Sequence, residues 1–466
     1  MKHKDSPVRK TKALARALIS ALVGVCIALA TVATPVAVRA QSKGSFIRDA
    51  EIEDTIRAYS TPIFQAAGLN AKAIDVYLIA APSLNAFVAG GMKMFLHTGL
   101  LQRADDPLQV MGVIAHESGH ITGGHLAGRR KELENATTGM IASLLLGLGA
   151  AVASGRGDVG VAVLGAGQTA IVGDLLSYSR TQEGSADQAA IKYLTRAGYS
   201  PQGLLEFMRK IEDQEVLLSS SQEPYLRTHP LTRDRISVLQ NAVEQHPKLR
   251  REAPTELQLK HKRMQAKLDG FLNNPRTVLE RYPADSDAVP ARYARAIAHY
   301  RIPDLKTALD EINALIAEYP DDPYFHELKG QVLFENGRIL DALPAYQRAV
   351  ELEPESALLR LGLAEVQVQA DGAEHNRNAI TNLQRVLDRE PRNAFAWRLK
   401  GVAHGRLGET AEASLALAEY GLYRGDLGQS IFQAQRAQKL MDKHSPGWLR
   451  AQDIEREAKR RQDQRN

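Results

Sequence analysis

The sequence predicts a mainly α protein in two parts, an α+β domain with a small sheet followed by an all-α solenoid of helical repeats. Between residue 41 and about residue 250, short strand-like pieces alternate with glycine-rich stretches and helices. From about residue 257 the pattern is almost wholly helical, and prolines recur there at a nearly fixed interval. The length of 466 residues also suits two or three domains better than one.

The first forty residues have the layout of a signal peptide. Lys and Arg residues open the chain, an apolar run covers residues 17–33, and the small-residue segment "AVRA" ends at Ala40. We therefore expect residues 1–40 to be a signal peptide that is cleaved after Ala40. An uncleaved anchor helix is the alternative, because the apolar run approaches the length that spans a bilayer.

Removal of this segment changes both the charge and the thiol content of the protein. The whole chain has a net charge of +5, but residues 1–40 hold seven Lys or Arg and one Asp, so the mature chain has a net charge of about −1. This balance argues against a broad basic surface for nucleic acid. The only cysteine, Cys26, lies in the apolar run, so the mature chain has neither a disulfide framework nor a cysteine nucleophile.

The second part, assigned to residues 256–466, has the period of a tetratricopeptide repeat. Prolines that close helix-like segments recur at intervals of 37, 34 and 37 residues, at Pro283, Pro320, Pro354 and Pro391. In the unit that ends at Pro354, the small and aromatic positions of the repeat are filled by Gly330, Ala342, Tyr346 and Ala349. An irregular helical bundle is the alternative. A solenoid has a concave face, so this part predicts a polypeptide partner.

The first part, assigned to residues 41–255, contains a candidate metal-binding helix. A helix is predicted from Asp106 onward, because a capping Asp is followed by Pro and by an apolar face. On this helix His116 and His120 lie one turn apart and can bind one Zn²⁺. Glu117 follows the first histidine directly, where its carboxylate can take a proton from a water at the metal.

A catalytic zinc site requires a third protein ligand. His125 fits poorly, because the three-histidine pattern requires position 126, where Leu126 stands, and His125 would lie about 140° around the helix from His120. We interpret His125 as a surface or supporting residue. Glu183 is the better candidate, since it lies one helical turn from Asp187, a second carboxylate that can orient a ligand histidine. A solvated acidic pair is the alternative.

Residues 140–176 form an apolar stretch rich in Gly and Ala. The segment "SGRGD" interrupts it, so neither half reaches the roughly 20 residues that a spanning helix requires. One interpretation is a helical hairpin or flap that covers the catalytic region or makes peripheral contact with a membrane. Ordinary core helices are the other, because periodicity cannot distinguish between buried environments.

These segments resemble a family of zinc metallopeptidases that includes the heat-shock membrane protease and the prenyl-protein endopeptidase. "HESGH" followed by "EGSAD" is similar to the family's HExxH and ExxxD pair, and "LNAFVAGGMKMFLHTGLL" is similar to its strand and turn segment. The resemblance implies a gluzincin-like fold in which one zinc ion is bound by His116, His120 and Glu183. It further implies that Glu117 is the general base and that Asp187 is the supporting acid.

The resemblance also gives meaning to the segment "THPLTRDRI". His229 matches a histidine that can occupy the open zinc position and keep the enzyme latent, and its place beside Pro230 suits a mobile loop. Spacing alone would make His229 a surface histidine. Arg235 matches an arginine of the same segment, and the sequence assigns it no role.

Within the family, a signal peptide, the lack of clear membrane spans and C-terminal repeats are similar to the periplasmic members that enhance β-barrel assembly. This similarity implies a periplasmic zinc endopeptidase that degrades misfolded or stalled outer-membrane β-barrel proteins and assists their assembly, with the repeats contacting the assembly machinery. Residues 85–96 can serve as an edge strand for unfolded substrates. The alternatives are a chaperone or adaptor with latent proteolysis, and a membrane-embedded protease that requires residues 140–176 to span the bilayer.

Overall fold

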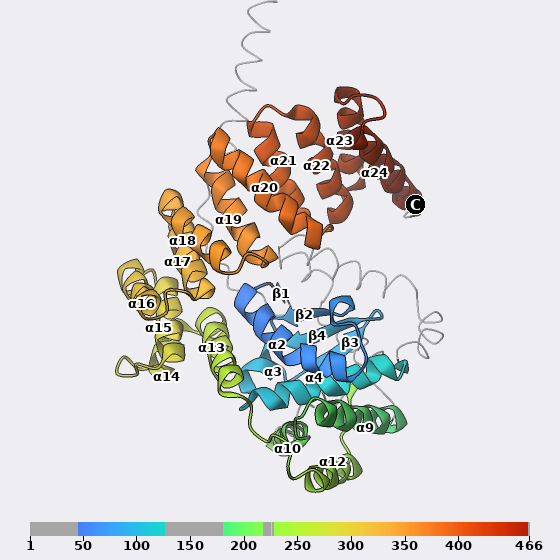
Figure 1. Cartoon of the computed structure of the whole chain (residues 1–466), viewed down its shortest axis with the longest axis vertical. Helices are drawn as coiled ribbons and strands as arrows, with labels where there is room; N and C mark the ends of the chain where they lie inside the picture. Colours follow the sequence, from blue (N-terminus) through green and yellow to red (C-terminus); the bar gives the residue numbers. More distant parts are fainter. Residues whose placement is uncertain (1–44, 126–179, 218–224, 226–227, 465–466) are drawn as a thin grey trace, which may run out of the picture. The chain divides into compact units, whose positions relative to one another are not determined.

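The computed structural model describes residues 45–125, 180–217, 225 and 228–464, and all structural statements below concern these residues. Figure 1 shows the order of their helices and strands. Two predicted features, the signal peptide at residues 1–40 and the apolar stretch at residues 140–176, lie outside the described residues.

A four-stranded sheet lies in the first part of the chain. Its strands have the order β1-β2-β4-β3, where β2 and β4 are parallel and the two outer pairs are antiparallel. Their bounds are Phe46–Ile47 for β1, Asp75–Ile79 for β2, Ala86–Ala89 for β3 and Lys93–His97 for β4. Gly90 and Gly91 have positive φ and form the tight turn between β3 and β4. The predicted edge strand of residues 85–96 is instead a hairpin, in which β3 lies at an edge of the described sheet and β4 lies between β2 and β3.

Helices of this part share a common core with the sheet. They are α2 (Ala50–Ala66), the short 3₁₀ helix η1 (Ala71–Ala73), α3 (Thr98–Arg103), α4 (Pro107–Thr122), α9 (Arg180–Arg196), α10 (Gln202–Leu217) and α12 (Arg233–Gln245). The helix α4 begins as the sequence predicts, because the Asp106 side chain accepts a hydrogen bond from the Leu108 N–H and Pro107 takes the first position. It contacts α2, α9 and α10, and Figure 1 shows α9 beside it. Among the described helices, none is long and apolar enough to cross a bilayer.

A close approach between α4 and α10 predicts a stability effect. A Cβ added at Gly112 would lie 2.8 Å from the Cα of Leu204 on α10. We expect Gly112→Ala to lower the free energy of unfolding by about 1–3 kcal/mol, because the added methyl group forces the helices apart. Chemical unfolding of the variant measures this change.

The control for this prediction is Gly428→Ala. A Cβ at Gly428 meets nothing within 4 Å, and the residue lies inside helix α23. Alanine favours a helix over glycine by up to about 1 kcal/mol, so this variant should be equally stable or slightly more stable. Equal destabilisation by the two substitutions would contradict the prediction that the close contact between α4 and α10 causes the loss of stability in Gly112→Ala.

The second part consists of paired helices, as the repeat pattern predicts. They are α13 (Thr255–Leu272), α14 (Pro275–Arg281), α15 (Val289–Arg301), α16 (Leu305–Glu318), α17 (Pro323–Glu335), α18 (Ile339–Leu352), α19 (Ala357–Ala370), α20 (Ala373–Arg389), α21 (Ala394–Arg406), α22 (Thr410–Arg424), α23 (Leu427–Leu440) and α24 (Pro446–Asp463). A Cβ at Gly330 would lie only 2.5 Å from the Tyr346 ring, and a Cβ at Gly362 would lie only 2.7 Å from it. Ala342 and Ala349 are fully buried beside it. The small and aromatic residues therefore determine how closely neighbouring helices pack.

Helix α13 connects the two parts. Its Met264 and Leu268 belong to the core around the sheet, whereas its Ala266 packs with Val278 and residues of α15. The proposed division of the chain at residues 255 and 256 falls at the start of this shared helix.

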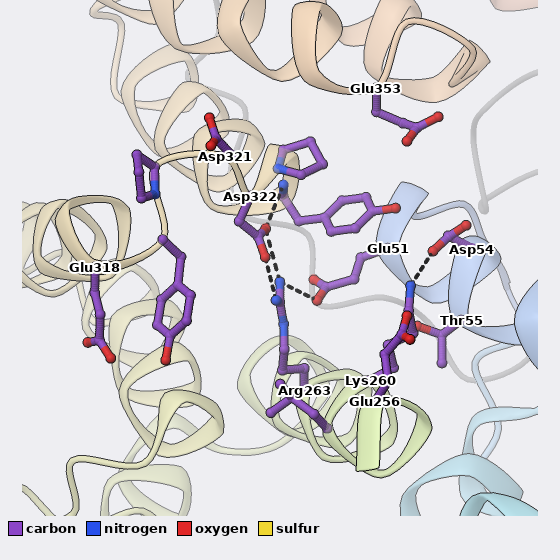
Figure 2. Close-up of a pocket in the computed structure, with 15 residues that line it drawn as sticks. Glu51, Asp54, Thr55, Glu256, Lys260, Arg263, Glu318, Asp321, Asp322 and Glu353 are labelled. Atoms are coloured by element: carbon purple, nitrogen blue, oxygen red, sulfur yellow. Dashed lines mark hydrogen bonds and ion pairs between the residues drawn. The ribbon is translucent and has the colours of Figure 1, made fainter. Parts of the chain in front are cut away.

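A pocket of about 570 Å³ lies beside α13, between α2 and the turn that leads into α17 (Figure 2). Most of its charged side chains already have partners. Arg263 Nη2 lies 2.7 Å from a Glu51 oxygen, and Lys260 Nζ lies 2.8 Å from Asp54 Oδ2. Arg263 also forms an ion pair with Asp322. Because these pairs balance much of the acidic lining, we assign the pocket no ligand.

Candidate metal centre

The helix α4 carries the HExxH segment into the core. Its side chains from Pro107 to His120 are all buried, and His116, Glu117 and His120 have no exposed surface. The helix α9 packs so closely against α4 that a Cβ at Gly119 would lie only 2.8 Å from the Ala186 carbonyl oxygen. Gly119 therefore permits the contact that brings the carboxylates of α9 to the histidines of α4.

Three of the predicted ligands lie together. His120 Nε2 is 3.1 Å from His116 Nε2 and 3.3 Å from Glu183 Oε1, and His116 Nε2 is 3.4 Å from Glu183 Oε2. With His229 they form a fully buried group whose candidate ligand atoms lie within 4.8 Å of one another. Two imidazoles and one carboxylate form a donor set typical of catalytic zinc sites. The chemistry and burial of these residues therefore fit a divalent metal ion.

His229 lies inside this group and is fully buried, so the surface position that spacing alone suggests is wrong. Its Nδ1 is 3.0 Å from Glu183 Oε1 and 3.4 Å from His116 Nε2. Its Nε2 is 3.3 Å from Glu117 Oε1. The ring stacks on Tyr225, with 4.5 Å between centroids and 22° between planes. His229 therefore contacts both a predicted ligand and the predicted base.

Glu117 is a fully buried carboxylate with few polar partners among the described residues. Its Oε2 has no hydrogen-bond partner among the described residues. Burial raises the pKa of Glu117, because the charged form loses its hydration. A buried polar atom without a partner indicates a position where a water or a substrate group binds. This position lies beside the candidate metal ligands.

Asp187 and Arg235 support the group from behind. His116 Nδ1 lies 2.9 Å from Asp187 Oδ1, on the side of the ring that faces away from the other ligands. The Arg235 guanidinium binds both oxygens of Asp187, with distances of 2.6 Å and 2.9 Å, and lies 2.7 Å from Glu183 Oε2. Although burial raises the pKa of Asp187, the contacts with His116 and Arg235 outweigh it and hold this pKa below its ordinary value.

Arg235 also reaches the loop that carries His229. It lies in the first turn of α12, where Thr232 caps the helix, and its Nη1 donates to the Pro230 carbonyl oxygen at 2.9 Å. One arginine thus holds the two carboxylates of α9 and the segment that follows His229. The sequence assigned Arg235 no role, and these contacts indicate that it holds the two carboxylates in place.

Two further contacts involve Tyr225 and His125. Tyr225 supports the His229 ring, and no sequence pattern identified it. His125 Nδ1 lies 2.9 Å from His120 Nδ1. The expected separation of about 140° around the helix is wrong, because α4 ends at Thr122, and of the two interpretations of His125, surface or supporting residue, this contact fits the second. Two successive glycines after Thr122 were the available signal of that end.

Comparison with known proteins defines the class of this enzyme. Residues 47–243 match Peptidase family M48, and residues 328–371 and 370–426 match the tetratricopeptide repeat. The chain therefore carries a peptidase family M48 domain followed by tetratricopeptide repeats, and it is a metalloendopeptidase. The mainly α fold with a small sheet is confirmed, and the family implies a bound metal ion.

Among individual proteins, the chain is similar to two with related names. It is 26% identical over 376 residues to the "Putative beta-barrel assembly-enhancing protease" of Vibrio cholerae, over 78% of this chain and 75% of the relative. It is 27% identical over 376 residues to the "Beta-barrel assembly-enhancing protease" of Yersinia pestis, over 76% and 72%. A shorter similarity, 25% over 174 residues, links 37% of this chain to 48% of the "Mitochondrial metalloendopeptidase OMA1" of Schizosaccharomyces pombe.

Proposed function

We propose that this chain is a periplasmic zinc-dependent endopeptidase that degrades misfolded or stalled outer-membrane β-barrel proteins and assists their assembly. The observation that carries the proposal is the buried group of His116, His120 and Glu183 beside the Glu117 carboxylate. The names of the relatives from Vibrio cholerae and Yersinia pestis support a role in barrel assembly. The periplasmic location rests on the signal peptide predicted at residues 1–40.

The residues of the site have separate tasks in this proposal. His116, His120 and Glu183 hold the metal, and Asp187 orients His116 through its Nδ1. When bound, Zn²⁺ polarises the peptide carbonyl and makes a coordinated water more acidic. Glu117 accepts the proton of the attacking water and passes it to the leaving amine.

Substrate binding is proposed at β3. An edge strand exposes backbone donors and acceptors that an extended peptide can pair with. Such pairing depends little on side chains, so the enzyme would select unfolded segments more than particular sequences. The proposed domain division assigns peptide hydrolysis to residues 41–255 and contact with the assembly machinery to the repeats at residues 256–466.

A second candidate function is a chaperone or adaptor of barrel assembly whose proteolysis is kept latent. The contacts of His229 with Glu117 and Glu183 favour it, because an imidazole in this position competes with water and substrate. Both candidates share the metal site and differ in how often that site is open.

The substitution His229→Ala tests the latent state. We expect casein cleavage by the mature protein to rise about tenfold or more, the factor that applies if at most a tenth of the molecules are open at rest. Zinc content should remain near one ion per chain, because the other three ligands are unchanged. Cleavage rates and metal analysis of purified protein provide both values.

The matched control is His246→Ala, at a partly exposed histidine that binds the Ala242 carbonyl near the end of α12. This control should cleave at the rate of the unsubstituted protein. Loss of cleavage in His229→Ala would show that His229 takes part in catalysis, and it would remove the latency argument. A protein without bound metal would contradict the proposed site as a whole.

A further inference from the structure

Helix α4 ends in a left-handed glycine turn. After Thr122 the chain continues as Gly123, Gly124 and His125, and Gly124 has a φ of +63°. Residues other than glycine rarely adopt this left-handed conformation. A continued helix would carry His125 away from His120, whereas this turn brings the chain back toward it.

Gly123 makes a second contribution to the same contact. A Cβ at Gly123 would lie 2.5 Å from His125 Nε2 and 2.8 Å from its Cε1. The imidazole of His125 therefore occupies the space that any side chain at position 123 would fill. Gly124 turns the backbone and Gly123 leaves room for the ring, so the two glycines together permit His125 to reach His120.

The nitrogen atoms of His120 face different partners. Its Nε2 points into the metal-ligand group, 3.1 Å from His116 Nε2 and 3.3 Å from Glu183 Oε1. Its Nδ1 points outward, 2.9 Å from His125 Nδ1, and the two rings are inclined by 73°. A neutral histidine that binds a metal through Nε2 carries its proton on Nδ1 and donates it to a supporting group.

We propose that His125 is a positioning residue that accepts the Nδ1 hydrogen bond of His120 and fixes the direction of its Nε2 toward the metal. The inference rests on the metal site proposed above. His125 contacts the outward nitrogen of His120, so it acts through that ligand. The two ligand histidines then have unlike supports, since His116 contacts the Asp187 carboxylate and His120 contacts a neutral imidazole.

The test compares His125→Phe with His125→Asn in the full mature chain. Phenylalanine retains a ring but offers no acceptor, whereas the Asn Oδ1 can occupy nearly the position of the histidine Nδ1. Zinc affinity is measured by competition with a chromogenic chelator, and the Co²⁺ form is examined by its visible absorption spectrum. Loss of a hydrogen bond behind a metal ligand typically weakens metal binding by about 10–100-fold.

We expect His125→Phe to weaken zinc binding by about 10–100-fold and to change the Co²⁺ spectrum. His125→Asn should retain an affinity within about threefold of the unsubstituted protein, because it keeps the acceptor. Unchanged affinity in His125→Phe, or equal weakening by Phe and Asn, would overturn the inference. If the unsubstituted protein binds no zinc, the proposed function and this inference both fail. If the unsubstituted protein binds zinc and His125→Phe binds it equally well, only this inference fails, so the two failures are distinguishable.

The glycines provide an independent arm of the same test. Gly124→Ala should weaken zinc binding in the direction of His125→Phe, because it strains the turn that returns His125 to His120. Gly68→Ala is the matched control, since Gly68 has a φ of +72° and a Cβ there meets nothing within 4 Å. Gly68→Ala should carry a similar backbone strain and leave zinc affinity unchanged. Equal loss of affinity in both variants would contradict the positioning role.

Discussion

Glu117→Gln is expected to reduce peptide cleavage by about 10²–10⁴-fold, because glutamine has the shape of glutamate but cannot accept the proton. Zinc content should remain near one ion per chain, since the predicted ligands are His116, His120 and Glu183. Casein cleavage and metal analysis of the same preparation measure the two quantities. Glu256→Gln is the control, because Glu256 is exposed on α13 beside the pocket of Figure 2, and its cleavage rate should not change.

The same substitution separates the two candidate functions. A protease that acts by degradation loses its effect on β-barrel assembly with Glu117→Gln, whereas a chaperone or adaptor retains it. Assembly of an outer-membrane β-barrel protein in cells that carry only the variant is the measurement. If Glu117→Gln cleaves casein at the original rate, Glu117 is not the general base and the mechanism must be reassigned.

Arg235→Met is expected to lower the free energy of unfolding of the metal-free protein by about 3–5 kcal/mol. Arg235 is 5% exposed and binds Asp187 through two nitrogens, so its removal takes the guanidinium away from two buried carboxylates, Asp187 and Glu183. Chemical unfolding in the presence of a chelator measures the loss. Arg235→Lys should recover only part of it, because an ammonium group cannot bind both oxygens in the same geometry.

The control is Arg348→Met. Arg348 forms an ion pair of similar length with Asp321, at 2.8 Å, but the two side chains are 42% and 79% exposed. Solvent screens such a pair, and its loss should cost no more than about 1 kcal/mol. Comparable destabilisation by the two substitutions would mean that burial of the Arg235 contacts adds nothing to the free energy of unfolding.

Much of the fold was predictable because it follows from local patterns. The cap at Asp106, the proline at position 107 and the histidines at positions 116 and 120 belong to one helix, whose geometry is nearly fixed. The repeats were predictable for a similar reason. Four prolines recur at intervals of 37, 34 and 37 residues, and Tyr346 packs against Gly330 of the helix before it, as the repeat pattern requires.

Contacts between distant segments were harder to predict. Glu183 and Asp187 could be paired by helical spacing, but the contact that places Glu183 beside His120 depends on Gly119, which permits α9 to approach. The role of Arg235 depends on three segments at once. Sequence spacing therefore identified candidate residues, whereas the partners of those residues required the packed structure.

The order in which these segments are synthesised has a consequence for the newly made chain. The α4 histidines emerge first, Glu183 follows more than sixty residues later, and Arg235 follows about fifty residues after that. Until α9 has packed on α4 and α12 on α9, the proposed carboxylate ligand and the arginine that holds it are absent from the neighbourhood of the histidines. An unfinished or unfolded chain thus lacks the assembled group of residues to which we assign peptide hydrolysis.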